Sequence, residues 1–199
     1  MLGDFDGARR NVALACEAEP LSPAVHALAA FQHAWSGEPE REVELARRAA
    51  ELGPNHFLAQ WSLGVASARN GLPGPAVTAL RRALQLVGGG PMVKCALARV
   101  LAEAGQRDEA RALLAELDER SGVHWVSPYQ RATVLAALGE RSAAFERLEQ
   151  AWQARDPWLA VVAVDPALSP LRSGRAYAEL LGRVFPGREP PRAAPARRR

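Results

Sequence analysis

Glycines recur at one spacing through most of this chain. Five of its 16 glycines follow one another at intervals of 34 residues; they are Gly3, Gly37, Gly71, Gly105 and Gly139. A fixed period of this length is the sequence signature of a repeat architecture, in which each unit buries its apolar face against its neighbours. The spacing therefore predicts a solenoid instead of one globular core.

Small residues keep the same phase as the glycines. Seven positions before each glycine the residues are Ala30, Gly64, Ala98 and Ala132. Five positions after each glycine the residues are alanine except at Glu42, and twelve positions after it they are alanine except at Leu117. Small side chains allow two helices to approach closely. Each unit is therefore expected to be a pair of antiparallel helices.

Each unit also has a stop signal seventeen positions after its glycine. The residues there are Pro20, Pro54, Gly88, Gly122 and Asp156, the last followed by Pro157. Proline and glycine end helices because the first removes a backbone donor and the second lowers helix propensity. Apolar residues between the stops recur at helical spacing, as at Leu97, Leu101 and Ala104. The pattern predicts an all-α fold, an α-solenoid of about 11 helices that ends in a capping helix.

The period also divides the chain into parts. We expect the second helix of a truncated repeat at 1–22, full repeats at 23–56, 57–90, 91–124 and 125–158, a capping segment at 159–186 and a basic tail at 187–199. The last amphipathic helix of the cap is predicted from Ser173 to Val184, and Trp125, Trp152 and Trp158 are expected to seal this end. The tail has no periodic apolar residues to offset the entropy of ordering, so it is predicted to be disordered.

A 34-residue unit with Leu-Gly in its first helix and alanines in its second resembles the tetratricopeptide repeat (TPR). The residues that carry the likeness best are Leu63, Gly64, Gly71, Ala76, Leu80 and Ala83. The resemblance implies a superhelix of antiparallel helix pairs that binds another protein.

The last third of the chain carries a second resemblance. Its motifs are Val126 to Tyr129, Ala137 to Gly139, Asp156 to Leu159, Val164 to Pro166 and Leu171 to Ser173. They are similar to the closing segment of bacterial TPR regions behind winged-helix transcription regulators, adenylate-cyclase-like proteins or Ser/Thr kinases. This likeness implies an alternative function, the regulatory or sensory C-terminal region of a signalling protein whose output domain lies upstream.

In a TPR superhelix the first helix of each unit lines a concave groove. Its second, fifth, ninth and twelfth positions are mostly apolar in this chain. The resemblance implies partner-binding residues at Phe31, Trp61, Val65, Arg69, Met92, Arg99 and Tyr129. Aromatic and methionine side chains would anchor a hydrophobic peptide or partner helix, and the two arginines would orient an acidic group. The alternative is that Phe31 and Trp61 turn into the core between helices and leave a shallower groove.

Residues that carry chemistry do not form a recognisable active site. The glycine-rich loop from Gly88 to Pro91 lacks the spacing that cradles phosphate, and no nucleophile elbow of the G-x-S-x-G type occurs. His26 and His33 share a helical face, but no nearby cysteine or carboxylate completes a metal site. We therefore expect no enzyme activity, cofactor, metal or small-molecule substrate.

The charge of the chain argues against nucleic acid as a partner. The net charge is +3, and residues 187–199 hold five arginines and one glutamate, so the rest of the chain is close to neutral. Phosphate binding needs clustered basic charge on a folded face. The apolar stretch from Trp158 to Val164 is far shorter than the roughly 20 residues that span a bilayer. A protein or peptide is the expected partner, and no membrane contact is expected.

Two further expectations concern location and assembly. Cys16 and Cys95 show neither a disulfide framework nor metal-ligand spacing, which is typical of a reducing compartment and predicts a cytoplasmic protein. The first helix begins in the middle of a repeat and would expose a face that a preceding helix normally covers. This position suggests two hypotheses: the chain belongs to a longer protein, or it self-associates through the N-terminal helix.

Overall fold

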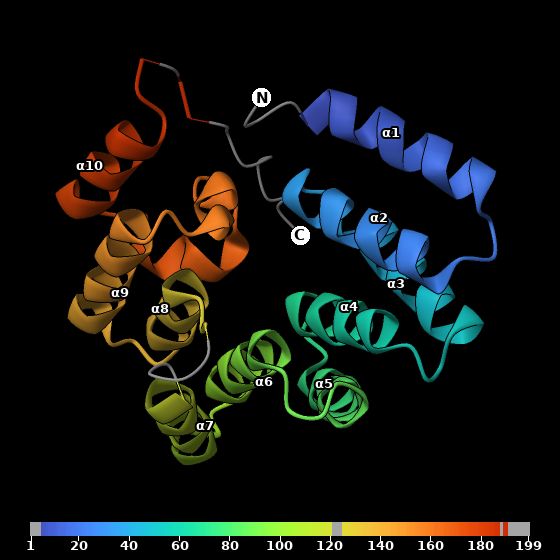
Figure 1. The fold of residues 1–199 in the computed structure, drawn as a ribbon, viewed down its shortest axis with the longest axis horizontal. Coiled ribbons are helices and arrows are strands. Elements are labelled where there is room, and N and C mark those ends of the chain that lie inside the picture. The colour runs from blue at the N-terminus through green and yellow to red at the C-terminus, as the bar shows by residue number, and fades with distance from the viewer. Residues whose placement is uncertain (1–4, 121–124, 188, 191–199) are drawn as a thin grey trace. The chain divides into compact units, whose positions relative to one another are not determined.

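The computed structural model of the chain describes residues 5–120, 125–187, 189 and 190. These residues form ten α-helices and two 3-10 helices and contain no strand (Figure 1). Consecutive helices pack against one another, as in a helical repeat. The predicted all-α fold is confirmed, with close to the expected number of helices.

The helices belong to two compact units, and the division falls within α6 (Pro91–Glu103). Unit 1 contains α1 (Phe5–Ala18), α2 (Pro23–Trp35), α3 (Pro39–Leu52), α4 (Phe57–Arg69) and α5 (Pro73–Leu86). Unit 2 contains α7 (Arg107–Arg120), α8 (Pro128–Ala137), α9 (Arg141–Gln153), η1 (Pro157–Val161), η2 (Pro166–Leu171) and α10 (Arg175–Val184).

Unit 1 is built from helix hairpins. The pairs α2 with α3 and α4 with α5 pack most extensively, and α2 also contacts α1 and α4. The core between these helices consists mainly of alanine, as at Ala30, Ala46 and Ala66, with Leu45 among them. Because alanine side chains are short, the backbones of paired helices lie close together.

Unit 2 combines a similar hairpin with a closing segment. Helix α8 packs on α9 and contacts both 3-10 helices, and α10 contacts α9. The C-terminal helix was predicted from Ser173 to Val184, and α10 begins two residues later. Most of the tail predicted to be disordered lies outside the described residues, as do Gly3 and Gly122.

The periodic glycines end the first helix of each pair in a left-handed conformation. Gly37, Gly71, Gly105 and Gly139 have φ between 72° and 83°. At each turn the next residue donates its N–H to the carbonyl five positions earlier, as Glu140 does to Leu135 at 2.9 Å. This is the Schellman arrangement, which favours glycine because a Cβ is disfavoured at positive φ. The 34-residue period in the sequence is thus a period of helix ends.

The small residue before each turn has a steric cause, seen most clearly at Gly64. A Cβ built on Gly64 would lie 2.5 Å from Leu80 Cγ and 3.1 Å from the carbonyl oxygen of Ala76. Leu80 and Ala76 are fully buried in α5, so neither can move into solvent. The equivalent residues Ala30, Ala98 and Ala132 are at most 1% exposed.

We predict that Gly64→Ala lowers the free energy of unfolding by about 1–3 kcal/mol, because the new methyl group overpacks the α4–α5 contact. Gly182→Ala is the control, since Gly182 lies exposed in α10 with no atom within 4 Å of a built Cβ. Removing a helical glycine there should add about 0.5–1 kcal/mol. Urea unfolding followed by circular dichroism measures both changes, and an unchanged or raised stability for Gly64→Ala would contradict the close approach.

Candidate binding surface

Phe31 and Trp61 meet where α2 packs on α4. Their ring centroids lie 4.5 Å apart with planes tilted by 46°, and Phe31 also stacks on Trp35 with centroids 6.4 Å apart. Both Phe31 and Trp61 are 8% exposed, and Val65, one turn after Trp61, is 4% exposed. Phe31 and Trp61 therefore take part in packing between first helices, and Val65 is buried on the same helix as Trp61. Their packing agrees with the alternative in which the aromatic rings turn toward the core.

The accessible part of the predicted surface in unit 1 is apolar. Ala24, Leu58, Ala68 and Met92 occupy predicted groove positions and are half-buried. The indole N–H of Trp61 is buried and has no hydrogen-bond partner within the described part of the chain. An unmet buried donor costs about 1–3 kcal/mol. The four half-buried residues are the accessible apolar positions of the predicted groove in unit 1.

Arg69 is paired within the fold. Its guanidinium lies 3.4 Å from a carboxylate oxygen of Glu42, which is 2% exposed. Glu42 stands at the position where most units have alanine, and a carboxylate buried there needs a cation nearby. The ion pair joins α3 to α4, so Arg69 has a structural partner that the sequence pattern did not reveal.

Arg99 and Tyr129 belong to unit 2, and both are buried. Arg99 is 7% exposed and pairs with Glu103 one turn later, with the nitrogen and oxygen 2.6 Å apart. Tyr129 is 1% exposed. In the described structure neither side chain presents a surface that a partner could contact, which differs from the role that the resemblance implied.

Tyr129 belongs to a buried polar network at the start of α8. Its hydroxyl donates to Asp165 at 2.9 Å, and its N–H donates to Asp156 at 3.1 Å. Asp156 also accepts the hydroxyl of Ser127 at 2.6 Å and the N–H of Trp158 at 3.1 Å. One buried carboxylate therefore caps the N-termini of both α8 and η1. Negative charge is favourable at a helix N-terminus, because unpaired N–H groups point outward there.

The three tryptophans near the C-terminal end differ in their exposure to solvent. Trp152 and Trp158 are half-buried, but Trp125 is 62% exposed. The expectation that Trp125 seals this end is therefore wrong, because its ring remains in solvent. The sealing side chains are instead Tyr129 and Tyr177, which are 1% and 4% exposed.

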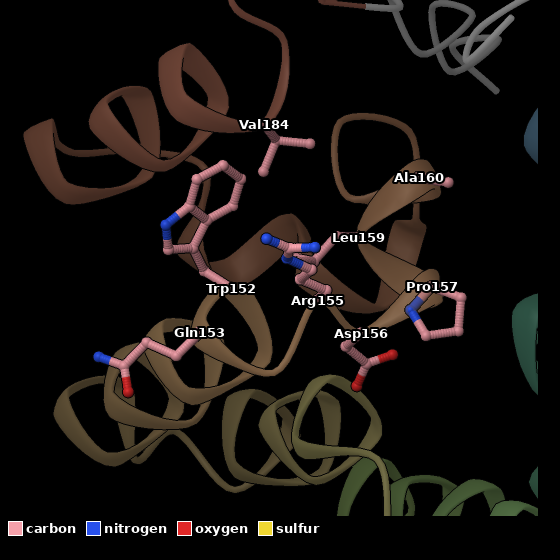
Figure 2. Close-up of a pocket in the computed structure, with 8 residues that line it drawn as sticks. All are labelled: Trp152, Gln153, Arg155, Asp156, Pro157, Leu159, Ala160 and Val184. Atoms are coloured by element: carbon pink, nitrogen blue, oxygen red, sulfur yellow. The ribbon is translucent and has the colours of Figure 1, made fainter.

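A cavity of about 700 Å³ opens in unit 2 beside Trp152 (Figure 2). Apolar side chains from α9, η1 and α10 form most of its lining, together with Gln153, Arg155 and Asp156. The sequence predicted a helix stop at Asp156 and Pro157, but no pattern indicated that a cavity would form around it. Its geometry depends on how η1 and α10 fold back on α9, which the repeat period does not describe.

The remaining titratable candidates are two histidines with local partners and the buried thiol of Cys95. The ring of His26 donates to the carbonyl of Pro20 at 3.0 Å, whereas His33 contacts Glu38 at 2.8 Å. Burial opposes ionisation of Glu38, but hydrogen bonds from Arg9 and His33 lower its pKa. Burial raises the pKa of Cys95 to about 12, so its thiol stays protonated near neutral pH.

The described residues contain no cluster of three or more side chains able to hold a metal ion. Across the same part of the chain, no helix has the length and apolar character needed to cross a bilayer. The hypothesis of self-association through the N-terminal helix stays a prediction. Three leucines near this end are prominent on the surface, with Leu14, Leu21 and Leu28 between 56% and 71% exposed.

Comparison with known proteins adds no assignment, since no family model and no curated protein matches the chain.

Both tyrosines of the chain are buried in unit 2, which predicts how the protein responds to alkali. Burial and the nearby Asp165 raise the pKa of Tyr129 well above its usual value, and burial raises the pKa of Tyr177. A raised folded pKa contributes stability that is present below the unfolded pKa, about 10, and is lost as pH rises through the folded pKa. Phenolate absorbance should therefore appear only together with loss of the helical circular dichroism signal.

The variant Tyr177→Phe isolates Tyr129 in the same titration. Its remaining phenolate should again appear only as helix is lost. A gradual titration of Tyr129 near pH 10 with full helicity would contradict its burial against Asp165.

Proposed function

We propose that this chain is a TPR module that binds a protein or peptide and has no catalytic activity. The support comes from the 34-residue period, the repeated left-handed glycine turns and the small residues at the contacts of paired helices. Repeat proteins of this type present extended surfaces suited to other proteins. A cytoplasmic location is part of the same proposal, supported by the two free thiols.

One observation carries the choice of surface. The first helices α2 and α4 lie side by side in unit 1, and the accessible residues at their predicted groove positions are apolar. The Trp61 ring lies beneath them, with its indole N–H buried. The surface thus suits the apolar side chains of an extended or helical peptide.

The partner is expected to be mainly apolar at this contact. Arg69 and Arg99 are engaged with Glu42 and Glu103, so an acidic group would have to compete with an internal carboxylate for either guanidinium. We propose that Leu58, Ala68 and Met92 supply the contact area and that the aromatic pair Phe31–Trp61 makes it rigid. A rigid aromatic base loses little entropy on binding.

Ala68→Arg tests this surface without removing a core side chain. Ala68 is half-buried on α4, so a long charged side chain there should interfere with apolar contact at this surface. Ala112→Arg on α7 is the matched control, because it makes the same chemical change at an exposed second-helix position. Peptides selected from a random library by the purified wild-type protein provide the probe.

Fluorescence anisotropy of the selected peptides gives the dissociation constants. Ala68→Arg should weaken binding by about tenfold or more, whereas Ala112→Arg should leave it unchanged. Failure to select any peptide, or equal affinities for the wild type and Ala68→Arg, would refute the proposed surface.

A further inference from the structure

Arg155 has a backbone conformation that its side chain does not favour. Its φ is 52°, the only positive value for a non-glycine residue in the described ranges. It follows the last turn of α9, where Asp156 donates its N–H to the carbonyl of Ala151 at 2.9 Å. This is the same helix ending that glycine makes at the periodic turns. An arginine at such a position is strained, because a left-handed backbone disfavours a Cβ. Strained residues of this kind are found most often at functional sites.

The guanidinium of Arg155 has no ion pair or hydrogen bond with any described residue, and the side chain is exposed. Figure 2 shows it extending into the cavity between Trp152 and Leu159. Asp156 is the one carboxylate in the lining, and its oxygens already accept hydrogen bonds from Ser127, Tyr129 and Trp158. The positive charge of Arg155 therefore faces a cavity with no available counter-charge.

The rest of the cavity is apolar and is held in place. Trp152 forms one wall, with the guanidinium of Arg183 5.7 Å from its ring centroid. Arg183 is itself fixed by two hydrogen bonds to Glu149, at 3.1 and 2.7 Å, which raise the pKa of Arg183. Leu159 and Val184 supply apolar surface on other sides. The cavity has a volume of about 700 Å³, which lies within the usual range for ligand pockets of roughly 300–1,000 Å³.

We propose that this cavity binds an internal segment of a partner protein in which an aspartate or glutamate stands next to a bulky apolar residue. The carboxylate pairs with the two-pronged guanidinium of Arg155, and the apolar side chain packs on Trp152 and Leu159. Charge complementarity selects this occupant, because the basic segment 187–199 of the chain itself would be repelled by Arg155. The site uses other residues than the α2–α4 surface, so the two proposals can fail independently.

The conformation of Arg155 gives the proposal a distinctive test. Arg155→Gly removes the cation and relieves the left-handed strain, so the variant should unfold at a higher urea concentration and yet lose binding. An arginine with only a structural role would give the opposite result, because its replacement would lower stability. Arg175→Gln is the control for charge, since Arg175 is exposed on α10 of the same unit and pairs with Glu179 one turn away.

The probes are fluorescein-labelled, C-terminally amidated peptides in which Glu stands next to Leu or Phe in a Gly-Ser background, together with matched Gln peptides. We expect the chain of 199 residues to bind the Glu peptides about tenfold more tightly than the Gln peptides. Arg155→Gly and Arg155→Gln should remove this preference, and Arg175→Gln and Ala68→Arg should keep it. Equal binding of Glu and Gln peptides, or a wild-type preference for Glu in Arg155→Gln, would overturn the proposal.

Discussion

The close approach of paired helices is the constraint on which the rest of the structure depends. Between α4 and α5 there is no room for one added methyl group at Gly64, because Leu80 and Ala76 lie directly against it. Alanines at the equivalent contacts reduce the core to short side chains and bring the backbones together. The two helices of each pair are also joined by a tight turn, which the left-handed glycines supply. The glycines and alanines of the period are thus two parts of one steric requirement.

Polar groups have a different task in each unit. In unit 1 the ion pair of Glu42 and Arg69 occupies a position that alanine fills in most units. In unit 2 the repeat pattern ends after α9. There Asp156 caps the N-termini of α8 and η1, and Asp165 caps η2 and accepts the Tyr129 hydroxyl. Each carboxylate accepts hydrogen bonds that would otherwise be unmet at a helix start. The closing segment is therefore held by specific hydrogen bonds as well as by apolar burial.

Sequence reasoning found what depends on period and missed what depends on the pairing of individual side chains. Gly71 and Gly64 could be recognised because helix ends and helix contacts repeat every 34 residues. The counter-charges of Arg69 and Arg99 were missed although the sequence held a signal for each. Glu42 breaks the alanine pattern, and Glu103 follows Arg99 at the i,i+4 spacing of helix ion pairs. Tyr129 occupies a groove position by count, but η1 and η2 fold over it and bury it. The cavity beside Arg155 was missed because its lining comes from α9, η1 and α10, and the repeat period does not describe how η1 and α10 fold back on α9.

The central claim is that each 34-residue segment is an equivalent structural unit, and an in-register deletion tests it most directly. Removing residues 57–90 joins two segments in the same phase, so the shortened chain should remain helical and unfold cooperatively in urea, although with lower stability. Removing only residues 57–73 breaks the phase and should leave a chain without a cooperative transition. If both deletions abolish cooperative unfolding equally, or if the shorter deletion is tolerated better, the repeat account is contradicted.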